Sequence, residues 1–382
     1  MADIWSGERI ARLISFYLPQ YHPIPENDAW WGAGFTEWIN VAQARPRFRG
    51  HYQPQLPADL GFYDLRLPET RQAQADLARE HGIFGFCYYH YWFNGRRVLN
   101  RPFDDVLRSG EPDFPFCLCW ANENWTRRWD GREADVLLQQ NYSDEDDARH
   151  MYWLAEAFRD PRYIRVDGKP LFMVYKASKL PDPQRTITTW RSVARQLGIG
   201  ELYLCKVESA WDERANPIEQ GFDAAVEFQP DATRYGARLP MGSRFWRRLD
   251  RTLVRMSSRL RHVEQLYDYN TIVSRMLQPR RLPYPLYPCV TPAWDNTARR
   301  QERATVIHGS TPAAYEKWLD AVITRALSTP QQAPMVFINA WNEWAEGAHL
   351  EPCQKWGRGY LEATRRALEH HSAERHTAPQ SV

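Results

Sequence analysis

The stretch that decides the fold is Val336-Phe337-Ile338-Asn339-Ala340-Trp341-Asn342-Glu343-Trp344-Ala345-Glu346-Gly347. Its first residues form a continuous apolar run, which is typical of a strand that is covered on both faces, as in parallel sheets. The run leads directly into two carboxylates three residues apart, set among indoles and an amide. Carboxylates carry out acid–base chemistry, indole faces stack on sugar rings, and amides bind hydroxyl groups. This mixture at the end of a buried strand indicates a carbohydrate-processing site.

Seven more short apolar runs precede this one, and helical patterns lie between most of them. The eight candidate strands are Leu13–Leu18, Ile83–Tyr89, Phe116–Cys119, Leu171–Tyr175, Leu202–Cys205, Ala224–Phe228, Leu286–Val290 and Met335–Ala340. The candidate helices are Pro68–Arg79, Ser143–Phe158, Thr186–Leu197, Thr311–Leu327 and Gly359–Glu369. Strands that alternate with helices in this way predict an α/β fold, a single (β/α)8 TIM barrel over residues 1–371. Residues 372–382 form a polar tail in this prediction.

Two regions interrupt the alternation of strands and helices. Pro19–Asp64 is rich in proline, glycine and aromatic residues and has almost no helical period, which predicts a long first βα loop that walls a site. Asp231–Arg281, between the sixth and seventh strands, contains twelve arginines, no lysine and four acidic residues. Its apolar residues at helical spacing are Phe245, Leu249, Leu253, Met256, Leu260 and Val263. We predict an amphipathic helical insertion packed on the barrel; a basic patch at 244–261 that docks on a membrane or another anionic surface is the alternative.

The composition narrows the class of protein. The 382 residues carry a formal net charge of +2, so no global field attracts nucleic acid. No apolar run approaches the ~18 residues of a transmembrane helix, and Met1–Glu8 has no features of a secretory signal. We therefore expect a cytoplasmic protein, with membrane-peripheral contact as the alternative. Five of the six cysteines lie in or beside apolar runs, which predicts buried, reduced thiols.

Aromatic and polar residues gather where the predicted strands end. In a (β/α)8 barrel the functional residues come from the carboxyl ends of the strands and from the loops after them. We expect substrate contacts from Tyr17, Tyr88, His90, Trp92, Trp120, Asn122, Glu123, Trp125, Tyr175, Trp294, Asp295, Asn296, Trp341, Asn342 and Trp344. Structural alternatives stay open for His90 as a hydrogen-bonding histidine, Glu123 as an ion-pair partner of Arg127 or Arg128, Asp295 as a turn cap and Trp294 as a core residue.

Glu343 and Glu346 are the predicted catalytic residues. Cleavage of a glycosidic bond needs one group that protonates the leaving oxygen and a second that supplies electrons or removes a proton on the sugar side. The pKa values of the two groups must differ, and unequal burial can separate them. We expect both acids to face a common pocket floored by indole rings. If either acid were buried in a salt bridge, or turned toward bulk solvent away from that pocket, the proposed reaction would lack its catalytic groups and would be ruled out.

The sequence disfavours a metal and a cofactor. Glu123, Glu343, Glu346 and His90 could together bind a divalent ion, but the chain has no His-x-x-x-His or Cys-x-x-Cys motif to support one. It also lacks the glycine-rich phosphate-binding motifs and the Gly-x-Ser-x-Gly nucleophile elbow. The prediction is an enzyme without metal or cofactor that acts on an oligosaccharide or polysaccharide.

Several motifs together resemble one known family. They are Phe16-Tyr17-Leu18-Pro19-Gln20-Tyr21-His22, Trp30-Trp31-Gly32 with Phe35-Thr36-Glu37-Trp38, Gly85-Phe86-Cys87-Tyr88-Tyr89-His90-Tyr91-Trp92-Phe93, Trp120-Ala121-Asn122-Glu123-Asn124-Trp125, Trp294-Asp295-Asn296-Thr297 and Trp341-Asn342-Glu343-Trp344-Ala345-Glu346-Gly347. This set resembles the WbsX-type family, which is similar to glycoside hydrolase family 99, the endo-α-mannosidases. The resemblance covers roughly Arg12 to Leu368.

The resemblance implies a (β/α)8 barrel and a carbohydrate-active enzyme. In the hydrolase relatives, the first Glu of an Asn-Glu-Trp-x-Glu-Gly motif is a base on the sugar's 2-hydroxyl, which closes on the anomeric carbon as a 1,2-anhydro sugar. The second Glu is the acid and then the base. Matched to this motif, Glu343 is the base, Glu346 is the acid/base, and the configuration is retained.

Two other functions stay open. WbsX-type proteins are usually named glycosyltransferases because they occur with O-antigen or capsule synthesis, so a transferase with an activated sugar donor is the first alternative. A carbohydrate-binding protein without catalysis is the second.

Overall fold

The computed structural model describes residues 11–127, 132–209, 213–239, 265–278, 280–300, 303–329 and 334–377. In this part of the chain the main sheet is a nearly closed barrel of parallel strands in the order β12, β10, β9, β8, β4, β2, β1, β16 and β13. The strands are β1 Arg12–Tyr17, β2 Ile83–Phe93, β4 Phe116–Trp120, β8 Lys169–Val174, β9 Tyr203–Glu208, β10 Ala224–Glu227, β12 Leu286–Tyr287, β13 Cys289–Val290 and β16 Met335–Ile338.

The seventh position of the barrel is a single apolar run that is divided between β12 and β13. β12 pairs with β10, where Tyr287 lies beside Val226, and β13 pairs with β16, where Cys289 lies beside Phe337. The run therefore joins the two ends of the sheet. The eight predicted apolar runs are the eight positions of the barrel, and the (β/α)8 fold is confirmed.

The barrel strands are covered on both faces. β4 and β10 are buried at every residue, which explains why their sequences are continuous apolar runs and not alternating patterns. Aromatic rings fill much of the interior: the ring centroid of Phe16 lies 5.6 Å from that of Tyr89 and 5.3 Å from that of Phe228. All six cysteines are free and buried, as predicted.

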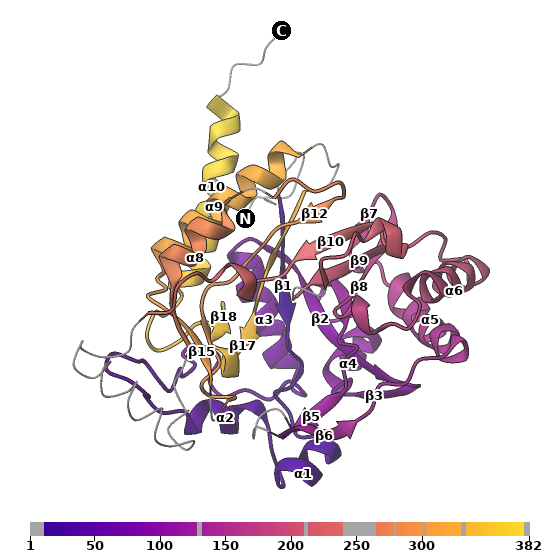
Figure 1. Cartoon of the computed structure of the whole chain (residues 1–382), viewed down its shortest axis with the longest axis horizontal. Helices are drawn as coiled ribbons and strands as arrows, with labels where there is room; N and C mark the ends of the chain where they lie inside the picture. The colour runs from indigo at the N-terminus through magenta and orange to yellow at the C-terminus, as the bar shows by residue number, and fades with distance from the viewer. Residues whose placement is uncertain are drawn as a thin grey trace.

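Several of the outer helices begin at polar caps. Ser143, Asp182 and Thr311 each accept a hydrogen bond from a backbone N–H three residues further on. The outer helices are α3 Pro68–Glu80, α4 Arg101–Ser109, α5 Asp144–Arg159, α6 Pro183–Gln196, α8 Tyr269–Met276, α9 Pro312–Ser328 and α10 Gly359–Thr377. Figure 1 shows α5 beside α6 on one side of the barrel and α9 beside α10 on the other. Since α10 continues to Thr377, the helix extends beyond the predicted start of the tail at residue 372.

The long first loop contains two short helices that the sequence did not predict. α1 Pro25–Trp31 and α2 Glu37–Gln43 have seven residues each, too few to leave a clear helical period. Figure 1 shows both at the end of the barrel toward which β1 runs. α2 packs against the 3-10 turn η7 Trp344–Glu346. The loop therefore walls the carboxyl end of the barrel.

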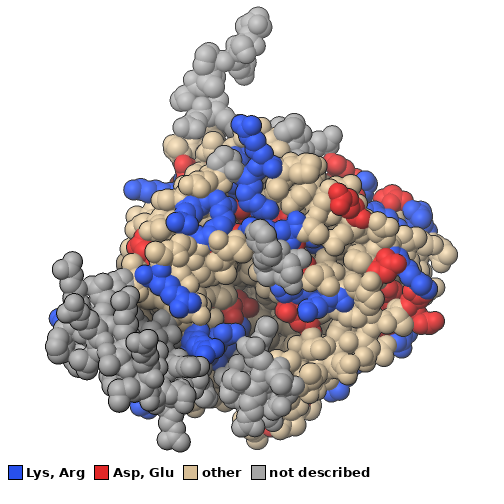
Figure 2. All heavy atoms as spheres, viewed as in Figure 1, with Lys and Arg blue, Asp and Glu red and all other residues tan. Residues whose placement is uncertain are grey.

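Short accessory strands at that end are β3 Arg96–Val98, β5 Trp125–Arg127, β6 Arg132–Leu138, β11 Gln265–Asp268, β14 Trp294–Asp295, β15 Thr305–His308, β17 Asn342–Glu343 and β18 Ala348–His349. β7 Arg165–Val166 pairs instead with the first two residues of β8, at the amino end. β5 pairs with β6, β17 pairs with β18, and β11, β15 and β14 form a three-stranded sheet. On the face shown in Figure 2, basic and acidic side chains lie interspersed.

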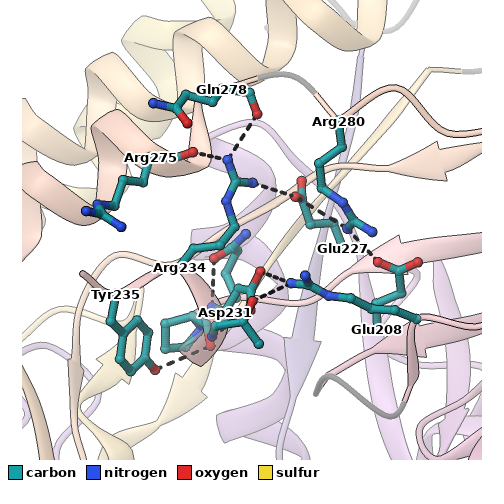
Figure 3. A network of polar contacts seen from close by, with 12 residues as sticks. Glu208, Glu227, Asp231, Arg234, Tyr235, Arg275, Gln278 and Arg280 are labelled. Carbon is teal, nitrogen blue, oxygen red and sulfur yellow. Dashed lines mark hydrogen bonds and ion pairs between the residues drawn. The ribbon is translucent and has the colours of Figure 1, made fainter.

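Much of the predicted insertion falls outside the described residues. Residues 240–264, which contain the predicted apolar face from Phe245 to Val263 and the basic segment 244–261, are not among them. The two ends of the insertion are described, and polar contacts hold both on the barrel (Figure 3). We call these contacts the anchor network, made of Glu208, Glu227, Asp231, Arg214, Arg234, Arg280 and Arg325. In the described part of the chain, no helix has the length and apolar character needed to cross a membrane.

Candidate active site

A cavity of about 720 Å³ opens at the carboxyl end of the barrel. Its volume is within the range of ~300–1,000 Å³ usual for small-molecule sites, which suits a short oligosaccharide segment. The predicted site residues that line it are Asn122, Glu123, Trp125, Tyr175, Trp294, Asn296, Glu343 and Glu346. The structure thus brings both predicted catalytic acids and part of the predicted binding set into one hollow.

A tight hairpin presents the two acids. Glu343 ends β17, Glu346 ends η7, and Gly347 turns the chain with a φ of 61°. A Cβ atom at Gly347 would lie 3.0 Å from both the Cβ atom and the backbone nitrogen of Asp295. Glycine is therefore required here both for the left-handed conformation and for the close approach of the neighbouring loop.

Hydrogen bonds to the end of the first strand hold this hairpin. The amide of Asn342 donates to the carbonyl of Leu18 at 3.0 Å and accepts from the backbone N–H of Leu18 at 2.7 Å. The hydroxyl of Tyr21 donates to the carbonyl of Asn342 at 2.7 Å and accepts from the N–H of Trp344 at 3.2 Å. Asn342 was predicted to contact substrate. Its side-chain amide instead makes two hydrogen bonds to the backbone of Leu18 and so joins the two loops.

A third carboxylate, Glu351, lies buried beneath the hairpin. It accepts hydrogen bonds from Trp344 Nε1 at 2.6 Å, from the hydroxyl of Tyr63 at 2.7 Å and from Gln74 Nε2 at 2.6 Å. Burial raises the pKa of Glu351 to about 7. The ring of Trp344 also stacks on His349, with centroids 3.7 Å apart. Trp344 is therefore fixed below the two acids and does not line the cavity.

Arg299 joins the two predicted catalytic acids. Its Nη2 lies 3.0 Å from Glu343 Oε2 and 3.1 Å from Glu37 Oε2, and its Nη1 lies 2.9 Å from Glu346 Oε1. Burial of either acid in a salt bridge was expected to rule out the proposed reaction, and the structure shows Glu343, whose side chain is 7% exposed, in such a pair with Arg299. Each acid, however, uses one oxygen for Arg299, and the second oxygen has no hydrogen-bond partner among the described residues. Because Arg299 itself lines the cavity, the ion pairs keep both acids at its wall.

Unequal burial distinguishes the two acids. The side chain of Glu343 is 7% exposed and that of Glu346 is 21% exposed. Burial raises the pKa of Glu343 to about 8, although the nearby Arg299 opposes this rise. A carboxylate pair can hold two protonation states at one pH only if the two environments differ. The hairpin provides this difference.

Strand β2 presents the opposite face from the one expected. Tyr89 and Tyr91 line the cavity, whereas the predicted contacts Tyr88, His90 and Trp92 lie outside its lining. Successive side chains of a strand point to opposite faces. Both faces of this strand are aromatic, so the pattern does not reveal which face turns inward.

The side chains that face away from the cavity have structural partners. His90 Nε2 lies 2.9 Å from His150 Nε2, and its ring stacks on Trp153 with centroids 4.5 Å apart. The structural alternative for His90 therefore describes it best. Trp92 donates a hydrogen bond to Asp146 at 3.0 Å.

Three more residues that were predicted to contact substrate lie instead in the packed core. The hydroxyl of Tyr17 donates to Gln74 on α3 at 2.7 Å. The ring of Trp120 packs against Trp190 on α6, and the ring of Trp341 against Phe86. All three are fully buried aromatic residues of the core.

Asp295 is a structural carboxylate. It lies 2.7 Å from His51 Nε2, and it accepts hydrogen bonds from Gln53 at 2.8 Å and from the hydroxyl of Thr297 at 2.6 Å. Although burial alone would raise its pKa, these partners lower the pKa of Asp295. It also accepts a hydrogen bond from the backbone N–H of Thr297 at 3.0 Å, so Asp295 caps a turn, which was the structural alternative for this residue. Asp295 thus ties the first loop to the segment that carries Arg299.

Half-buried tryptophans surround the opening. Trp30 from α1 and Trp125 from β5 meet with ring centroids 5.7 Å apart, and Trp294 from β14 also lines the cavity. The carboxylate of Glu123 has no hydrogen-bond partner in the described part of the chain; the side chains of Arg127 and Arg128 lie outside that part. Indole faces beside hydrogen-bonding groups that still lack partners suit the binding of sugar rings.

Two lining amides already have partners. The side chain of Asn122 donates to the carbonyl of Lys176 at 2.8 Å and accepts from its N–H at 2.8 Å. The side chain of Asn296 accepts from the N–H of Thr305 at 2.8 Å. These residues line the cavity as predicted, but their polar atoms mainly hold its loops in place.

Sequence reasoning missed several lining residues. They are Asn27, Trp30, Trp31, Tyr89, Tyr91, Gln140, Tyr142, Lys179, Phe228, Arg299 and Arg300. Trp30 and Trp31 lie in a Trp-Trp-Gly motif that the resemblance had marked. Arg299 left no local signal, because its partners Glu343 and Glu37 are 44 and 262 residues away in the sequence.

The described residues contain one group with the spacing of metal ligands. Asp320 on α9 and His370 and His371 on α10 form it, outside the cavity lining. The prediction that the reaction needs no metal stays a prediction.

A sequence model described as "Glycosyltransferase WbsX" matches residues 13–364. The chain belongs to the WbsX family. A curated relative of this WbsX protein, "Uncharacterized protein WxcX" of Xanthomonas campestris pv. campestris (strain B100), is 45% identical over 364 residues, which are 94% of this chain and 50% of that protein. The WbsX chain spans about half the length of the curated relatives it matches.

Two solved structures share the fold of this chain. A "Glycoside hydrolase-like protein" matches with a TM-score of 0.59 and 14% identity, over 96% of each chain. The GH99 endo-α-mannosidase from Bacteroides thetaiotaomicron matches with a TM-score of 0.58 and 14% identity, over 96% of this chain and 99% of that chain. At this identity the likeness establishes the (β/α)8 fold. Family and fold together support a carbohydrate-active enzyme.

Proposed function

We propose that this protein cleaves or transglycosylates glycosidic bonds of an oligosaccharide or polysaccharide, with Glu343 and Glu346 as its catalytic residues. The observation that carries the proposal is the meeting of both acids, through Arg299, in a tryptophan-rimmed cavity at the carboxyl end of a (β/α)8 barrel. Active sites of this fold lie at that end. The fold alone does not specify a reaction, so the proposal rests on the site.

In the proposed reaction Glu343 is the base and Glu346 the acid. Glu343 removes the proton of the 2-hydroxyl, whose oxygen bonds to the anomeric carbon while the glycosidic bond breaks. Glu346 gives its proton to the departing oxygen. Water or the hydroxyl of a second sugar then attacks the anomeric carbon and gives a proton to Glu346, while the bond between O2 and the anomeric carbon breaks and Glu343 returns its proton to O2, so both acids regain their starting states and the configuration is retained. This route needs a 2-hydroxyl trans to the leaving group, as in α-mannosides.

The burial of the acids supports these roles. Glu343 is the more buried, and a raised pKa makes its ionised form a stronger base than an ordinary carboxylate. Glu346 is the more exposed, which suits a group that exchanges protons with a departing oxygen and then with water. Arg299 offsets the charge that the pair carries when both acids are ionised.

A glycosyltransferase in O-antigen or capsule synthesis is the second candidate, and the description of the matching family favours it. Incubation with α-mannosidic oligosaccharide alone, and then with nucleotide sugar, separates the two functions. Hydrolysis or transglycosylation in the absence of donor supports our proposal, and NMR of the first-formed anomer tests retention. Product that forms only with the donor would establish the transferase instead.

A catalytic variant and a matched control complete the experiment. Glu346→Gln should bind the same glycan without turning it over. Glu26→Gln is the control. Glu26 lies in the first loop but outside the cavity lining, and its carboxylate pairs with the exposed Arg96 at 2.6 Å. This variant should leave turnover unchanged. Equal activity of wild type and Glu346→Gln would show that other residues catalyse the reaction, and no activity in either would indicate a protein that only binds glycan.

A further inference from the structure

Three carboxylates meet one guanidinium in the wall of the cavity. Arg299 contacts Glu37, Glu343 and Glu346 at 3.1, 3.0 and 2.9 Å. We propose that Glu37 and Arg299 are a positioning pair that decides which of the two catalytic acids holds a proton when substrate arrives. The inference rests on the proposed function, and it assigns a role to Glu37, which does not line the cavity.

The position of Glu37 is imposed by the fold. It is the first residue of α2, and α2 packs against η7, which carries Glu346. The ring of Trp38 lies against Trp344 with centroids 5.6 Å apart, which holds the start of α2 on the hairpin. The side chain of Glu37 is 0% exposed, so its carboxylate reaches Arg299 from the side away from solvent.

The count of charges requires a shared proton. Arginine stays protonated in proteins, so the cluster carries +1 from Arg299 and −3 if all three acids are ionised. A buried site disfavours a net charge of −2, because desolvation and like-charge repulsion both favour the neutral acid. At least one of the three acids is therefore protonated near neutral pH.

Glu37 competes with Glu343 for the same donor. Both carboxylates lie on Nη2 of Arg299, while Glu346 lies on Nη1. One oxygen of Glu37 has no hydrogen-bond partner among the described residues, although it is fully buried. Burial raises the pKa of Glu37, with Arg299 opposing the rise, in the same direction as for Glu343. When Glu37 is protonated, the positive charge of Arg299 stabilises the ionised forms of the two catalytic acids. When Glu37 is ionised, it neutralises part of that charge and the stabilisation of the catalytic acids is weaker.

Five tyrosines lie near the cluster, and burial raises the pKa of each one, so they stay neutral: Tyr21, Tyr89, Tyr91, Tyr175 and Tyr235. The other charged residues that line the cavity with Glu343, Glu346 and Arg299 are Glu123, Lys179 and Arg300. Among the residues in direct contact with Arg299, the shared proton therefore lies on one of the three acids.

Glu37→Gln tests the inference through the pH dependence of kcat/KM. The substitution removes the competing charge but keeps the size of the side chain, so the pKa of Glu343 should fall. We expect the limb of the pH–rate profile that Glu343 sets to move to lower pH by about one unit, the lower end of the shifts caused by a single close charge. The Glu26→Gln control should keep the wild-type profile. A Glu37→Gln profile that coincides with wild type overturns the inference, while wild type still active on glycan leaves the proposed function standing.

Thermal unfolding tests the same inference without any activity. A Glu with a raised pKa stabilises the fold at low pH, and this stability is lost as pH rises from the unfolded value through the folded one. Between about pH 5 and about pH 8, the Tm of wild type should therefore fall more than the Tm of Glu37→Gln. Equal pH dependence of the two Tm values overturns the inference even if the proposed function has failed.

A measurement on the wild-type protein tests the inference even if Glu37→Gln does not fold. Carboxyl-carbon NMR of glutamate-labelled wild type should show, in addition to Glu351, whose pKa is raised to about 7, at least one glutamate that is still protonated at about pH 6. Glu351→Gln and Glu343→Gln identify the resonances of those two residues, and Glu37→Gln that of Glu37. Titration of every glutamate other than Glu351 as an ordinary exposed carboxylate overturns the inference.

Discussion

Two networks of carboxylates and arginines lie at the carboxyl end of the barrel, and their charge balance differs. The site cluster has three acids, Glu37, Glu343 and Glu346, around the single Arg299. The anchor network has three acids and four arginines, so each carboxylate has a cation of its own (Figure 3). A carboxylate with its own cation stays ionised and holds structure, whereas an excess of acids must share a proton.

The two networks also differ in what they contact. The site cluster lines a cavity, and Glu343 and Glu346 each keep an oxygen without a hydrogen-bond partner among the described residues. In the anchor network Glu208 accepts from Arg280 and from the hydroxyl of Tyr284, both at 2.6 Å. We therefore assign the proposed chemistry to the network that is incompletely neutralised, while the fully paired one fastens the ends of the insertion.

The largest expected difference is in turnover. Glu346→Gln should lower kcat by about 10²–10⁴-fold, because it removes a proton donor needed in the transition state. Glu208→Gln in the anchor network should lower stability while the folded protein keeps its kcat. Steady-state kinetics with a parallel Tm measurement checks both. A similar loss of kcat in the two variants would erase the distinction between the networks.

Removal of one arginine from each network compares how much the two arginines contribute to stability. Arg299→Met leaves the buried Glu37 and Glu343 and the partly exposed Glu346 without this cation, so the free energy of unfolding should fall by about 3–5 kcal/mol at about pH 8 and by less at about pH 5, where the two buried acids, whose pKa values are raised, are protonated. Arg280→Met should have a smaller effect, because Glu227 keeps Arg325 at 3.0 Å and Glu208 keeps Tyr284. Urea unfolding at both pH values measures this. A loss for Arg299→Met that does not depend on pH would contradict proton sharing.

The pH dependence of wild type sharpens the roles of the two acids. Because the pKa of Glu343 is raised to about 8, a base at this position is ionised only as pH approaches and passes that value. We expect kcat/KM to rise about tenfold per pH unit below it. The pH profile of kcat/KM shows the sign directly. A fall through this range would make Glu343 the acid and reverse the proposed roles.

The glycine of the hairpin tests how closely the site cluster depends on its loop. Gly347→Ala forces a side chain into a left-handed position against Asp295, so we expect a loss of about 1–3 kcal/mol in stability together with a lower kcat. Gly357→Ala is the matched control, since Gly357 is also left-handed, with a φ of 53°, but no atom lies within 4 Å of the added Cβ. Its effect should be smaller and confined to stability. Equal effects on kcat would show that strain alone, and not the contact with Asp295, matters.

The smallest effect is expected at the rim. Trp30→Ala removes an indole from the cavity lining, so KM should rise by about 2- to 10-fold while kcat changes little. Tyr152→Ala, an exposed aromatic residue of α5 outside the lining, is the control. Kinetics on oligosaccharides of increasing length measures the difference. An unchanged KM would exclude Trp30 from glycan binding.

The strands were predictable because their signal is local. Each of the eight predicted runs is a position of the barrel, since a strand buried on both faces needs a continuous apolar run wherever it lies. The short helices α1 and α2 were not predictable in this way, because seven residues give less than two full periods.

Prediction of the site was weaker because it depends on which face of a strand turns inward. Tyr88 and Tyr89 are chemically alike and adjacent, yet only Tyr89 lines the cavity. Glu343 and Glu346 were found because a buried strand runs directly into them. Sequence pattern could not assign Asp295, Asn342 and Trp344 to structural roles, since each depends on a partner in a distant loop.

The amino-acid sequence alone determined the eight strands of the barrel and the place of the two acids directly after the last one, because hydrophobic patterning acts over a few residues at a time. Only the tertiary structure decided that Arg299 stands between these acids and that Glu37 reaches it from 262 residues away. Electrostatic partners are selected by distance in space and by burial, and neither is written in the neighbourhood of a residue along the chain.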